Sequence, residues 1–391
     1  MKILVVNTLY YPNFQGGAEK SVQLLCEGFV DKGNEVVVVS NSLKNDVVNI
    51  NGVTVHYLRT RNVRSFLKVK GAPVFLRLLW HLIDIFNPFY FFYFKRLIKN
   101  FKPDVLFTNN LSGFSVFVWV VASFKKMPIV HTLRDHALMC PRGSMFNKNR
   151  RCDKQCFKCR VFSFPKKKMS SLVSGVVGIS EYILSRHKGI GYFSNVKYSI
   201  TIPNSVADLP NYTKGEIKNK QGLVFGYFGR LCREKGVEYL VDDFLNLDDV
   251  DTGKLLLGGT GEDEFVAGLK QKCVGKNIEF LGYVSPVDFY SKIDYLLVPS
   301  LMQEPFGRVV IEAWQYGVFV IAAESGGMTE LQKYGNLELF NPEKGALAEK
   351  IQLALKGGFT FDQDKYLNNK SLFNKNIVSQ TYLDLFKSLK K

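Results

Sequence analysis

Residues 296–331 read LLVPSLMQEPFGRVVIEAWQYGVFVIAAESGGMTEL, and this stretch decides the fold. The apolar run at 295–299 predicts a buried parallel strand that proline ends, and the run at 318–322 predicts the next strand. Between them we expect a loop over 300–305 and a helix over 308–316, which Phe306 and Gly307 open. The order strand, loop, helix, strand is the repeating unit of a parallel α/β sheet.

Two carboxylates hold fixed places in this unit, Glu304 in the loop and Glu312 inside the helix. The helix N-terminus offers unpaired amides and the positive end of the helix dipole, which suit a phosphate. We interpret this layout as a site for a phosphorylated sugar. The amides would bind the phosphate, and each carboxylate would bind hydroxyl groups on one side of it. Charged helices also produce such glutamate pairs by chance, and the surrounding strand and helix pattern favours the functional interpretation.

Composition fits a globular protein of two domains. The chain has 391 residues, of which 46% are apolar, enough for two sizeable cores. Residues 2–7 predict a first strand rather than a signal peptide, and the wholly apolar run 116–122 is too short to span a bilayer. We therefore expect a cytoplasmic protein whose seven cysteines are thiols or metal ligands rather than disulfides.

The net charge of +17 is concentrated in one half of the chain. Residues 1–210 carry 30 Lys and Arg against 11 Asp and Glu, whereas the remainder carries 22 against 24. A strongly basic half attracts nucleic acid, an anionic membrane or a phosphorylated substrate. Lysines that only keep a surface soluble would be spread more evenly.

Strands alternate with helices in both halves, so we predict an α/β protein with two doubly wound parallel-sheet (Rossmann-like) domains. The first domain, 1–205, is basic, and a polar linker without periodicity follows at 206–222. The second domain covers 223–370, and 371–391 forms a helix that we expect to pack back on the first domain. The predicted strands are 2–7, 35–40, 53–58, 103–107, 128–133, 173–179, 223–228, 254–257, 278–281, 295–299 and 318–322.

Residues 61–102 interleave Phe, Leu, Trp and Tyr with Arg and Lys and contain a single acid, Asp84. This composition is typical of helices that lie in a membrane interface. Two other interpretations stay open: two helices packed on the sheet and broken at Asn87-Pro88, or an apolar face that meets a partner. An aromatic and basic surface also suits single-stranded nucleic acid, but no RNP, KH or zinc-finger pattern supports that function.

Polar residues gather where a predicted strand of the first domain ends. His131, Arg134, Asp135 and His136 lie at the carboxyl edge, where an α/β sheet binds its ligands. Gly17, in the first strand-to-helix turn, is by itself typical of a plain loop.

Four of the seven cysteines fall within twenty positions, at Cys140, Cys152, Cys156 and Cys159. Four thiols can close a tetrahedral structural zinc site, with free thiols as the next alternative and disulfides as the last. The basic run 166–168 follows them and suits anionic lipid head groups.

The second domain brings phosphate-compatible groups to one edge of its sheet. Arg230 follows the first strand and Lys235 comes five residues later, so the two cations can clamp a diphosphate. The glycine loop 258–261 and the start of the 308–316 helix end on the same edge. Solvated loop charges are the alternative interpretation of both cations.

Several segments occur in a characteristic order: GRLCREKG at 229–236, LGGTG at 257–261, FLGYV at 280–284, EPFGRVVIEA at 304–313 and SGGMTEL at 325–331. Together with GGAE at 16–19, they resemble the family 4 retaining glycosyltransferases (glycosyl transferases group 1). That resemblance implies the GT-B fold, in which two Rossmann-like domains face a central cleft. It also implies a nucleoside-diphosphate sugar as donor and no catalytic metal.

The resemblance implies a role for each matching residue. Arg230 and Lys235 would hold the donor diphosphate and neutralise the leaving group, while Glu312 would bind the ribose and Glu304 the transferred sugar. The amides at Phe306 and Gly307 would contact the sugar and the phosphate. The backbone near Tyr283 would contact the nucleobase, and Gly17 would approach the phosphate.

The first domain departs from the family pattern in the segment TLRDHALMCPRG. Arg134 stands where a histidine is common, whereas Asp135 matches, and His131 or His136 could replace that histidine. We therefore take Glu304, Asp135 and His131 as candidate catalytic residues. The acidic run 249–251 mimics a metal-binding Asp-x-Asp, and we interpret it as a surface loop.

We predict a glycosyltransferase that moves a sugar to an acceptor hydroxyl with retention of anomeric configuration. The acceptor would be a lipid-linked or envelope glycan in polysaccharide or lipopolysaccharide biosynthesis. The basic domain predicts an anionic membrane surface as partner, a peripheral position at the inner face of the cell membrane, and no nucleic-acid partner. The alternatives are a GT-B-type nucleotide-sugar epimerase or hydrolase, and a non-enzymatic membrane or nucleic-acid binding protein.

Overall fold

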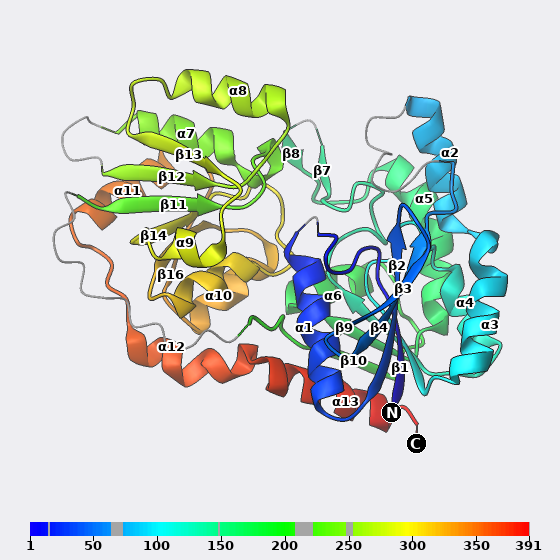
Figure 1. The fold of residues 1–391 in the computed structure, drawn as a ribbon. Helices are drawn as coiled ribbons and strands as arrows, with labels where there is room; N and C mark the ends of the chain where they lie inside the picture. The colour runs from blue at the N-terminus through cyan, green and yellow to red at the C-terminus, as the bar shows by residue number, and fades with distance from the viewer. Residues whose placement is uncertain (15, 64–72, 148, 208–221, 248–252, 391) are drawn as a thin grey trace. The chain divides into compact units, whose positions relative to one another are not determined.

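The computed structural model describes residues 1–14, 16–63, 73–147, 149–207, 222–247 and 253–390. The chain divides into two compact units: unit 1 contains 1–145, 152–207 and 372–391, and unit 2 contains 146–151 and 208–371. Each unit is built on a parallel sheet flanked by helices, so the predicted class of two doubly wound α/β domains is confirmed (Figure 1). Most of the predicted linker, and the acidic run 249–251, lie outside the described residues.

Unit 1 contains an eight-stranded sheet in the order β10-β9-β6-β5-β1-β2-β4-β3, parallel except for β3, which runs antiparallel to β4 at one edge. The strands are β1 (Lys2–Val6), β2 (Glu35–Ser42), β3 (Asp46–Ile50), β4 (Val53–Arg59), β5 (Val105–Thr108), β6 (Ile129–Leu133), β9 (Gly175–Gly178) and β10 (Tyr198–Thr201). Strand order reverses between β1 and β5, and a doubly wound sheet opens its ligand crevice at such a switch point.

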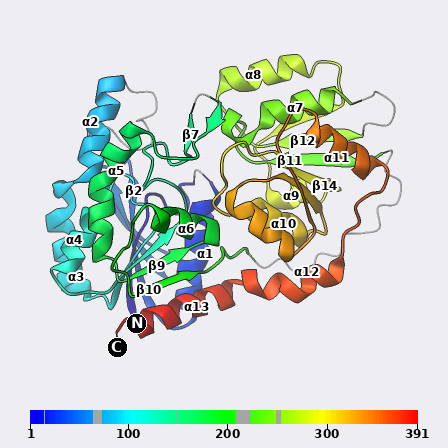
Figure 2. The ribbon, with the colours of Figure 1, turned by 180° about the vertical axis from the view of Figure 1, so that it is seen from behind.

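Two helices from opposite ends of the chain share one core of unit 1. Helices α1 (Gly17–Asp31) and α13 (Lys375–Ser388) lie side by side in both views (Figures 1 and 2). On α13, Tyr382 and Phe386 pack their rings 5.3 and 5.4 Å from that of Phe107 in β5. The last helix is therefore a structural part of the unit formed by the first half of the chain.

The other helices of unit 1 pack against one another, α2 against α5, α3 against α4, and α4 against α5. They are α2 (Val74–Ile85), α3 (Phe91–Phe101), α4 (Phe117–Ser123), α5 (Phe157–Met169) and α6 (Glu181–Gly189). Between α2 and α3 the chain breaks at Asn87, as in one of the interpretations left open above. The Asn87 side chain accepts a hydrogen bond from the Phe89 amide at the start of η2 (Pro88–Tyr90). Among the described residues, no helix combines the length and the apolar character needed to cross a membrane.

Unit 2 contains a six-stranded, wholly parallel sheet in the order β13-β12-β11-β14-β15-β16. The strands are β11 (Val224–Phe228), β12 (Lys254–Gly258), β13 (Ile278–Gly282), β14 (Tyr295–Val298), β15 (Phe319–Ala323) and β16 (Leu337–Phe340). The helices are α7 (Val237–Leu245), α8 (Asp263–Lys272), α9 (Pro286–Tyr290), α10 (Arg308–Gln315), α11 (Ala346–Leu355) and α12 (Gln363–Asn369). Here the switch point lies between β11 and β14. A short antiparallel pair, β7 (Phe146–Asn147) and β8 (Arg150–Arg151), completes the described strands.

Candidate active site

A lysine and a glutamate meet at the switch point of unit 2. Lys235 ends the short helix η4 (Arg233–Lys235) after β11, and Glu304 lies in the loop after β14. Lys235 Nζ and Glu304 Oε1 are 2.6 Å apart, and the two side chains are 26% and 10% exposed. The pair is therefore an ion pair largely withdrawn from water, at the edge where such sheets bind ligands.

Further hydrogen bonds orient Glu304. Ser300 Oγ donates to Oε1 at 2.5 Å, the Glu304 amide donates to Ser325 Oγ at 2.9 Å, and the Gly327 amide donates to the Glu304 carbonyl at 2.7 Å. Lys235 and Ser300 both use Oε1, so the carboxylate is fixed through one oxygen while Oε2 stands outside these bonds.

The electrostatics of this pair keep Glu304 ionised. Burial by itself would raise the pKa of Glu304, but the charge of Lys235 and the hydrogen bonds from Lys235 and Ser300 outweigh burial and lower the pKa. An ionised carboxylate accepts hydrogen bonds at both oxygens and donates none. Glu304 is therefore suited to bind hydroxyl groups.

Glycines allow the loops of this edge to pack backbone against backbone. Gly236 has φ +72°, and a Cβ there would lie 1.9 Å from the Pro299 carbonyl oxygen. Gly259 has φ +137°, and a Cβ there would lie 1.8 Å from the Gly229 carbonyl oxygen. Any other residue would push these loops apart, and Lys235 directly precedes the first of these two turns.

Arg230 and the glycine loop 258–261 lie on the same edge. The Leu231 amide donates to the Thr260 carbonyl at 2.8 Å and joins the two loops. Arg230 Nη2 is 3.5 Å from Glu234 Oε1, and its side chain is 47% exposed. Such an exposed ion pair contributes little to stability, so an anionic ligand can replace Glu234 as the partner of Arg230.

Glu312 lies on α10, which begins after Gly307 in a left-handed conformation with φ +99°. Its Oε1 is 2.7 Å from Arg308 Nε, and Tyr290 donates to Oε2 at 3.3 Å. Phe306 is buried beside Gly307. Tyr283, directly after β13, is 89% exposed. Unit 2 thus carries all predicted donor-binding residues except Gly17, which begins α1 in unit 1.

Unit 1 holds a second polar cluster, at the carboxyl ends of β5 and β6. Arg134 is 7% exposed and donates from Nε to Asn109 Oδ1 at 2.7 Å and from Nη1 to Asn204 Oδ1 at 2.5 Å. Asn110 Nδ2 donates to Asp135 Oδ2 at 2.6 Å. The predicted polar edge therefore exists, with side-chain amides as its main partners.

The environment of Asp135 raises its pKa, whereas the environment of Glu304 lowers the pKa of that residue. Burial raises the pKa of Asp135, and the Ala137 amide and the charges of Lys166 and Arg134 lower it without cancelling the effect of burial. A carboxyl group with a raised pKa holds its proton to higher pH, which is the property of a general acid or base.

His131 has the contacts of a core residue. Its Nδ1 is 2.9 Å from Thr108 Oγ1, its ring stacks on Phe193 at 5.9 Å, and it is 3% exposed. Burial, with the charges of His187 and Arg134, lowers the pKa of His131 to about 3. Such an enclosed, neutral imidazole is poorly suited to exchange protons with a substrate. His136 is fully buried as well, and it stacks on His187 at 6.3 Å.

The cysteines do not build the predicted zinc site. Cys140 and Cys159 have their sulfur atoms 3.7 Å apart, and the hydrogen bond from Cys159 lowers the pKa of Cys140 to about 6. Cys156 is exposed at the start of α5, and burial raises the pKa of Cys152. In the parts of the chain that the structure describes, no three His, Cys, Asp or Glu side chains are arranged to hold a metal ion. All seven cysteines are thiols.

The sequence interpretation missed the amide and hydroxyl partners of both clusters. Asn109 and Asn110 come one residue after the predicted strand 103–107, so their place at the sheet edge was a usable signal. Asn204 reaches Arg134 across seventy positions of sequence, and Ser325 reaches Glu304 across twenty-one. Only the folded chain brings these pairs together.

Comparison with known proteins identifies the family of the chain. A family model described as "Glycosyltransferase Family 4" matches residues 15–192, and one described as "Glycosyl transferases group 1" matches residues 210–371. An uncharacterized 42.6 kDa protein in the cps region of Klebsiella pneumoniae is 36% identical over 390 residues, which cover 99% of this chain and 100% of that protein.

Two solved structures share the fold. Sucrose-phosphate synthase from Thermosynechococcus elongatus has a TM-score of 0.75 at 19% identity, over 99% of this chain and 98% of that one. Anabaena HepE in complex with UDP has a TM-score of 0.70 at 18% identity, over 99% of this chain and 100% of that one. The chain therefore belongs to the family 4 glycosyltransferases (glycosyl transferases group 1) and has their GT-B fold.

Proposed function

We propose that this glycosyltransferase moves a sugar from a nucleoside-diphosphate donor to a hydroxyl of a glycan acceptor, with retention of anomeric configuration. The acceptor belongs to capsule or related envelope polysaccharide biosynthesis. The relative encoded in a cps region supports that setting, and the structural relative bound to UDP supports a nucleotide-sugar donor.

The observation that carries this proposal is the Lys235–Glu304 pair at the switch point of unit 2. A half-buried cation and a buried carboxylate lie 2.6 Å apart, so the lysine can bind the diphosphate and the glutamate the hydroxyls of the sugar. Lys235 and Arg230 neutralise the diphosphate as it leaves, which is electrostatic stabilisation of the developing charge. The Oε2 atom of Glu304 accepts from hydroxyls of the transferred sugar.

The remaining donor contacts follow from position. The amides that open α10 at Phe306 and Gly307 contact the phosphate and sugar. Glu312 binds the ribose hydroxyls, since a carboxylate has lone pairs beyond those used by Arg308 and Tyr290. Tyr283, which is exposed directly after β13, contacts the nucleobase of the donor. The role of Gly17 at the phosphate stays a prediction.

Thermal unfolding in the presence of nucleoside-diphosphate sugars tests the donor assignment. A sugar nucleotide at a hundred times its Kd should stabilise the protein by about 2.7 kcal/mol and raise its Tm, and the free sugar should not. Product analysis by NMR then separates the activities. A new glycosidic bond with the donor's anomeric configuration is expected, whereas a changed or hydrolysed sugar nucleotide without acceptor would indicate an epimerase or hydrolase.

A membrane-facing surface is the second part of the proposal. On and just after α2, an apolar stripe at helical spacing stays exposed, with Phe75, Leu79, Leu82 and Phe86 between 40% and 67% exposed. On α5, which packs against α2, Phe157, Val161 and Phe164 form a similar stripe between 54% and 73% exposed. Exposed lysines and arginines accompany these stripes: Lys95, Arg96 and Lys99 on α3, and Lys158, Arg160 and Lys168 on α5.

This combination of apolar stripes and positive charge fits an anionic bilayer surface, so we place the protein peripherally at the inner face of the cell membrane. Co-sedimentation with phosphatidylglycerol-containing vesicles at low salt should exceed that with phosphatidylcholine alone. Replacing Phe75, Leu79 and Leu82 by serine should abolish the difference. A matched change of exposed apolar residues in unit 2, Val274 and Val287 to serine, should not. Equal sedimentation of wild type and both variants would show that the residues on α2 do not bind the membrane.

A further inference from the structure

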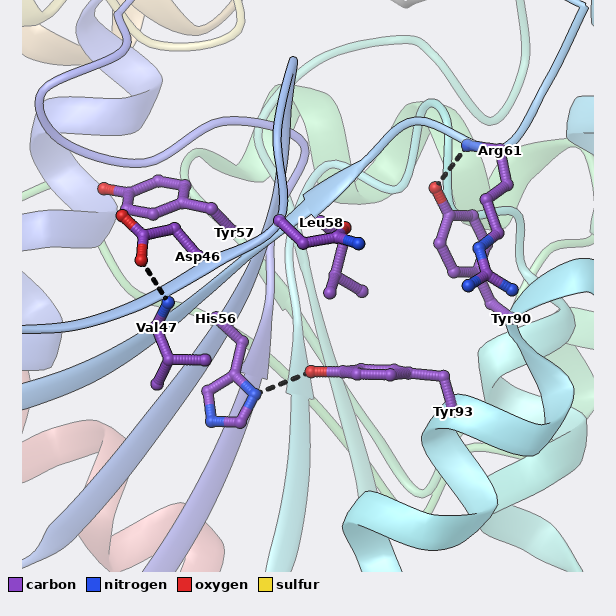
Figure 3. Close-up of a pocket in the computed structure, with 9 residues that line it drawn as sticks. Asp46, Val47, His56, Tyr57, Leu58, Arg61, Tyr90 and Tyr93 are labelled. Atoms are coloured by element: carbon purple, nitrogen blue, oxygen red, sulfur yellow. Dashed lines mark hydrogen bonds between the residues drawn. The ribbon is translucent and has the colours of Figure 1, made fainter.

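A cavity of about 330 Å³ lies in unit 1, between the segment η2–α3 and the edge strand β3 with its neighbour β4 (Figure 3). Its polar and aromatic lining includes Asp46, His56, Tyr57, Arg61, Tyr90 and Tyr93. All of these residues belong to unit 1, whereas the proposed donor groups Lys235 and Glu304 belong to unit 2. The cavity shares no residue with the proposed donor site and calls for a ligand of its own.

The aromatic walls of the cavity are fixed in place. The Tyr90 hydroxyl accepts from the Arg61 amide at 2.8 Å, and Tyr90 is 2% exposed. The Tyr57 hydroxyl donates to the Tyr11 carbonyl. The Tyr57 ring belongs to the core on the opposite face of β4 from His56, so Tyr90 and Tyr93 supply the aromatic wall on the His56 side (Figure 3). The backbone holds the Tyr90 ring in place before any ligand arrives.

Two polar side chains, His56 and Arg61, line the space beside Tyr93. Asp46 pairs across the strands with Tyr57, so its carboxylate lies on the Tyr57 side of the sheet, away from His56 and Tyr93 (Figure 3). His56 Nδ1 is 2.7 Å from the Tyr93 hydroxyl, and the other ring nitrogen points away from Tyr93 (Figure 3). Arg61 contributes a guanidinium.

This set of groups fits a sugar ring. Aromatic faces pack against the C–H faces of a pyranose, and imidazole and guanidinium side chains bond its hydroxyls. Burial lowers the pKa of His56, so the ring is neutral near pH 7 and offers one donor and one acceptor. The volume lies at the small end of the range for ligand pockets, which suits a small saccharide.

The wall formed by η2 and α3 also has an outer face. Tyr90 and Tyr93, three residues apart, line the cavity, whereas Phe89 and Phe92, also three residues apart, are 56% and 77% exposed. Residues at this spacing share a helix face. One segment therefore presents tyrosines to the cavity and phenylalanines to the outside, so a polar ring and an apolar chain can bind next to each other.

We propose that this cavity binds a sugar residue in the head group of a lipid-linked acceptor, with the start of the lipid along Phe89 and Phe92. This inference rests on the proposed function, since it names the acceptor class of the same transferase. The full chain is used to test it, with methyl and octyl glycosides of glucose, galactose and mannose as probes, the octyl forms below their micelle concentration.

NMR of protein labelled with 15N-histidine reports binding at His56, whose signal the His56→Gln variant assigns. At least one methyl glycoside should shift that signal. Tyr93→Leu should weaken binding about tenfold, through loss of a ring contact and a hydroxyl. Arg61→Ala, at an exposed position, should weaken it as well. Phe92→Leu, an exposed position on the same helix, should leave methyl glycoside binding unchanged.

The octyl glycoside should bind about tenfold more tightly than its methyl counterpart, and serine at both Phe89 and Phe92 should remove this gain. If none of the glycosides shifts His56, or if Tyr93→Leu and Arg61→Ala bind as wild type, the sugar site is wrong. No gain for the octyl form would overturn the lipid-linked assignment. Donor-induced thermal shifts of the same variants should match wild type, so a failed donor proposal appears in that assay and a failed acceptor proposal in the NMR.

Discussion

Glu304 and Asp135 occupy equivalent places in two sheets, yet their surroundings drive their pKa values apart. Each lies after a parallel strand at the carboxyl edge of a doubly wound sheet. Glu304 is paired with a lysine at 2.6 Å, and its pKa is lowered. Asp135 is bonded to the amide of Asn110, and its pKa is raised by burial.

The difference shows that the fold supplies the position while the neighbouring side chains decide the chemistry. A lysine makes one carboxylate a permanent charge, which suits holding a diphosphate sugar. Asp135, whose neighbour is an uncharged amide, keeps a raised pKa, which suits proton transfer. Unit 2 is therefore the better candidate for binding the charged donor, and unit 1 is the better candidate for acid–base catalysis at the acceptor.

The largest expected effect comes from removing the charge that distinguishes Glu304. Glu304→Gln keeps the size of the side chain but leaves Lys235 without its carboxylate partner. We expect kcat/KM for transfer to fall by about 10²–10³, the range found when a preorganised polar group is removed from an active site.

The matched control for that substitution is Glu338→Gln. Glu338 forms a comparable ion pair with Lys350 in unit 2, about a third exposed, but lies outside the proposed site. Steady-state assays should find it close to wild type. Equal losses in both variants would mean that Glu304 acts only through the stability of unit 2.

A smaller effect is expected from replacing Arg134, the buried cation of unit 1. Arg134 uses two different nitrogens to bond Asn109 and Asn204, and a lysine has a single terminal nitrogen. Arg134→Lys should therefore lose one charged hydrogen bond and lower the free energy of unfolding by about 2 kcal/mol. Chemical denaturation checks this value, with exposed Arg151→Lys as the control. Unchanged stability would show that one nitrogen satisfies the cluster.

The smallest effect is a pH dependence of opposite sign in the two regions. The lowered pKa of Glu304 adds stability above its ordinary value of 4.5, and this is lost as pH falls through the folded value. The raised pKa of Asp135 adds stability below its ordinary value of 3.8, which is lost as pH rises through the folded value.

Thermal unfolding between about pH 3 and 7 should show this contrast as Tm differences of a few degrees, about 2–4 °C per kcal/mol. The advantage of wild type over Glu304→Gln should grow with pH, and its advantage over Asp135→Asn should shrink. Parallel slopes would mean that the two carboxyl groups share one kind of environment.

The parallel strands were predictable because their apolar runs and the glycines that follow them are local signals. The strands predicted at 295–299 and 318–322 appear as β14 (Tyr295–Val298) and β15 (Phe319–Ala323), and the helix at 308–316 appears as α10. Strand β3 was missed because none of its five residues is buried, and only its pairing with β4 defines it.

The candidate site was predictable in part. The order of Arg230, Lys235, Glu304 and Glu312 along the chain, read through the family resemblance, indicated one edge of one domain. The role of His131 could not be read, because its enclosure by Phe193 depends on residues sixty positions away. For the possible zinc site, spacing in sequence does not fix where four sulfur atoms point, and among the described residues these cysteines form no group arranged to hold a metal ion.

Helix α13 has a consequence for the order in which the protein is made. Its Tyr382 and Phe386 fill a core with Phe29 and Phe107, so unit 1 stays incomplete until the ribosome has released nearly the whole chain. Between the last early residue of unit 1 and the first residue of its returning segment lie 164 residues of the other unit, from Asp208 to Ser371. At about 5–20 residues per second, the nascent first half waits about 10–30 s with that core uncovered. A stop codon shortly before α13 should therefore impair the half of the protein that was translated first.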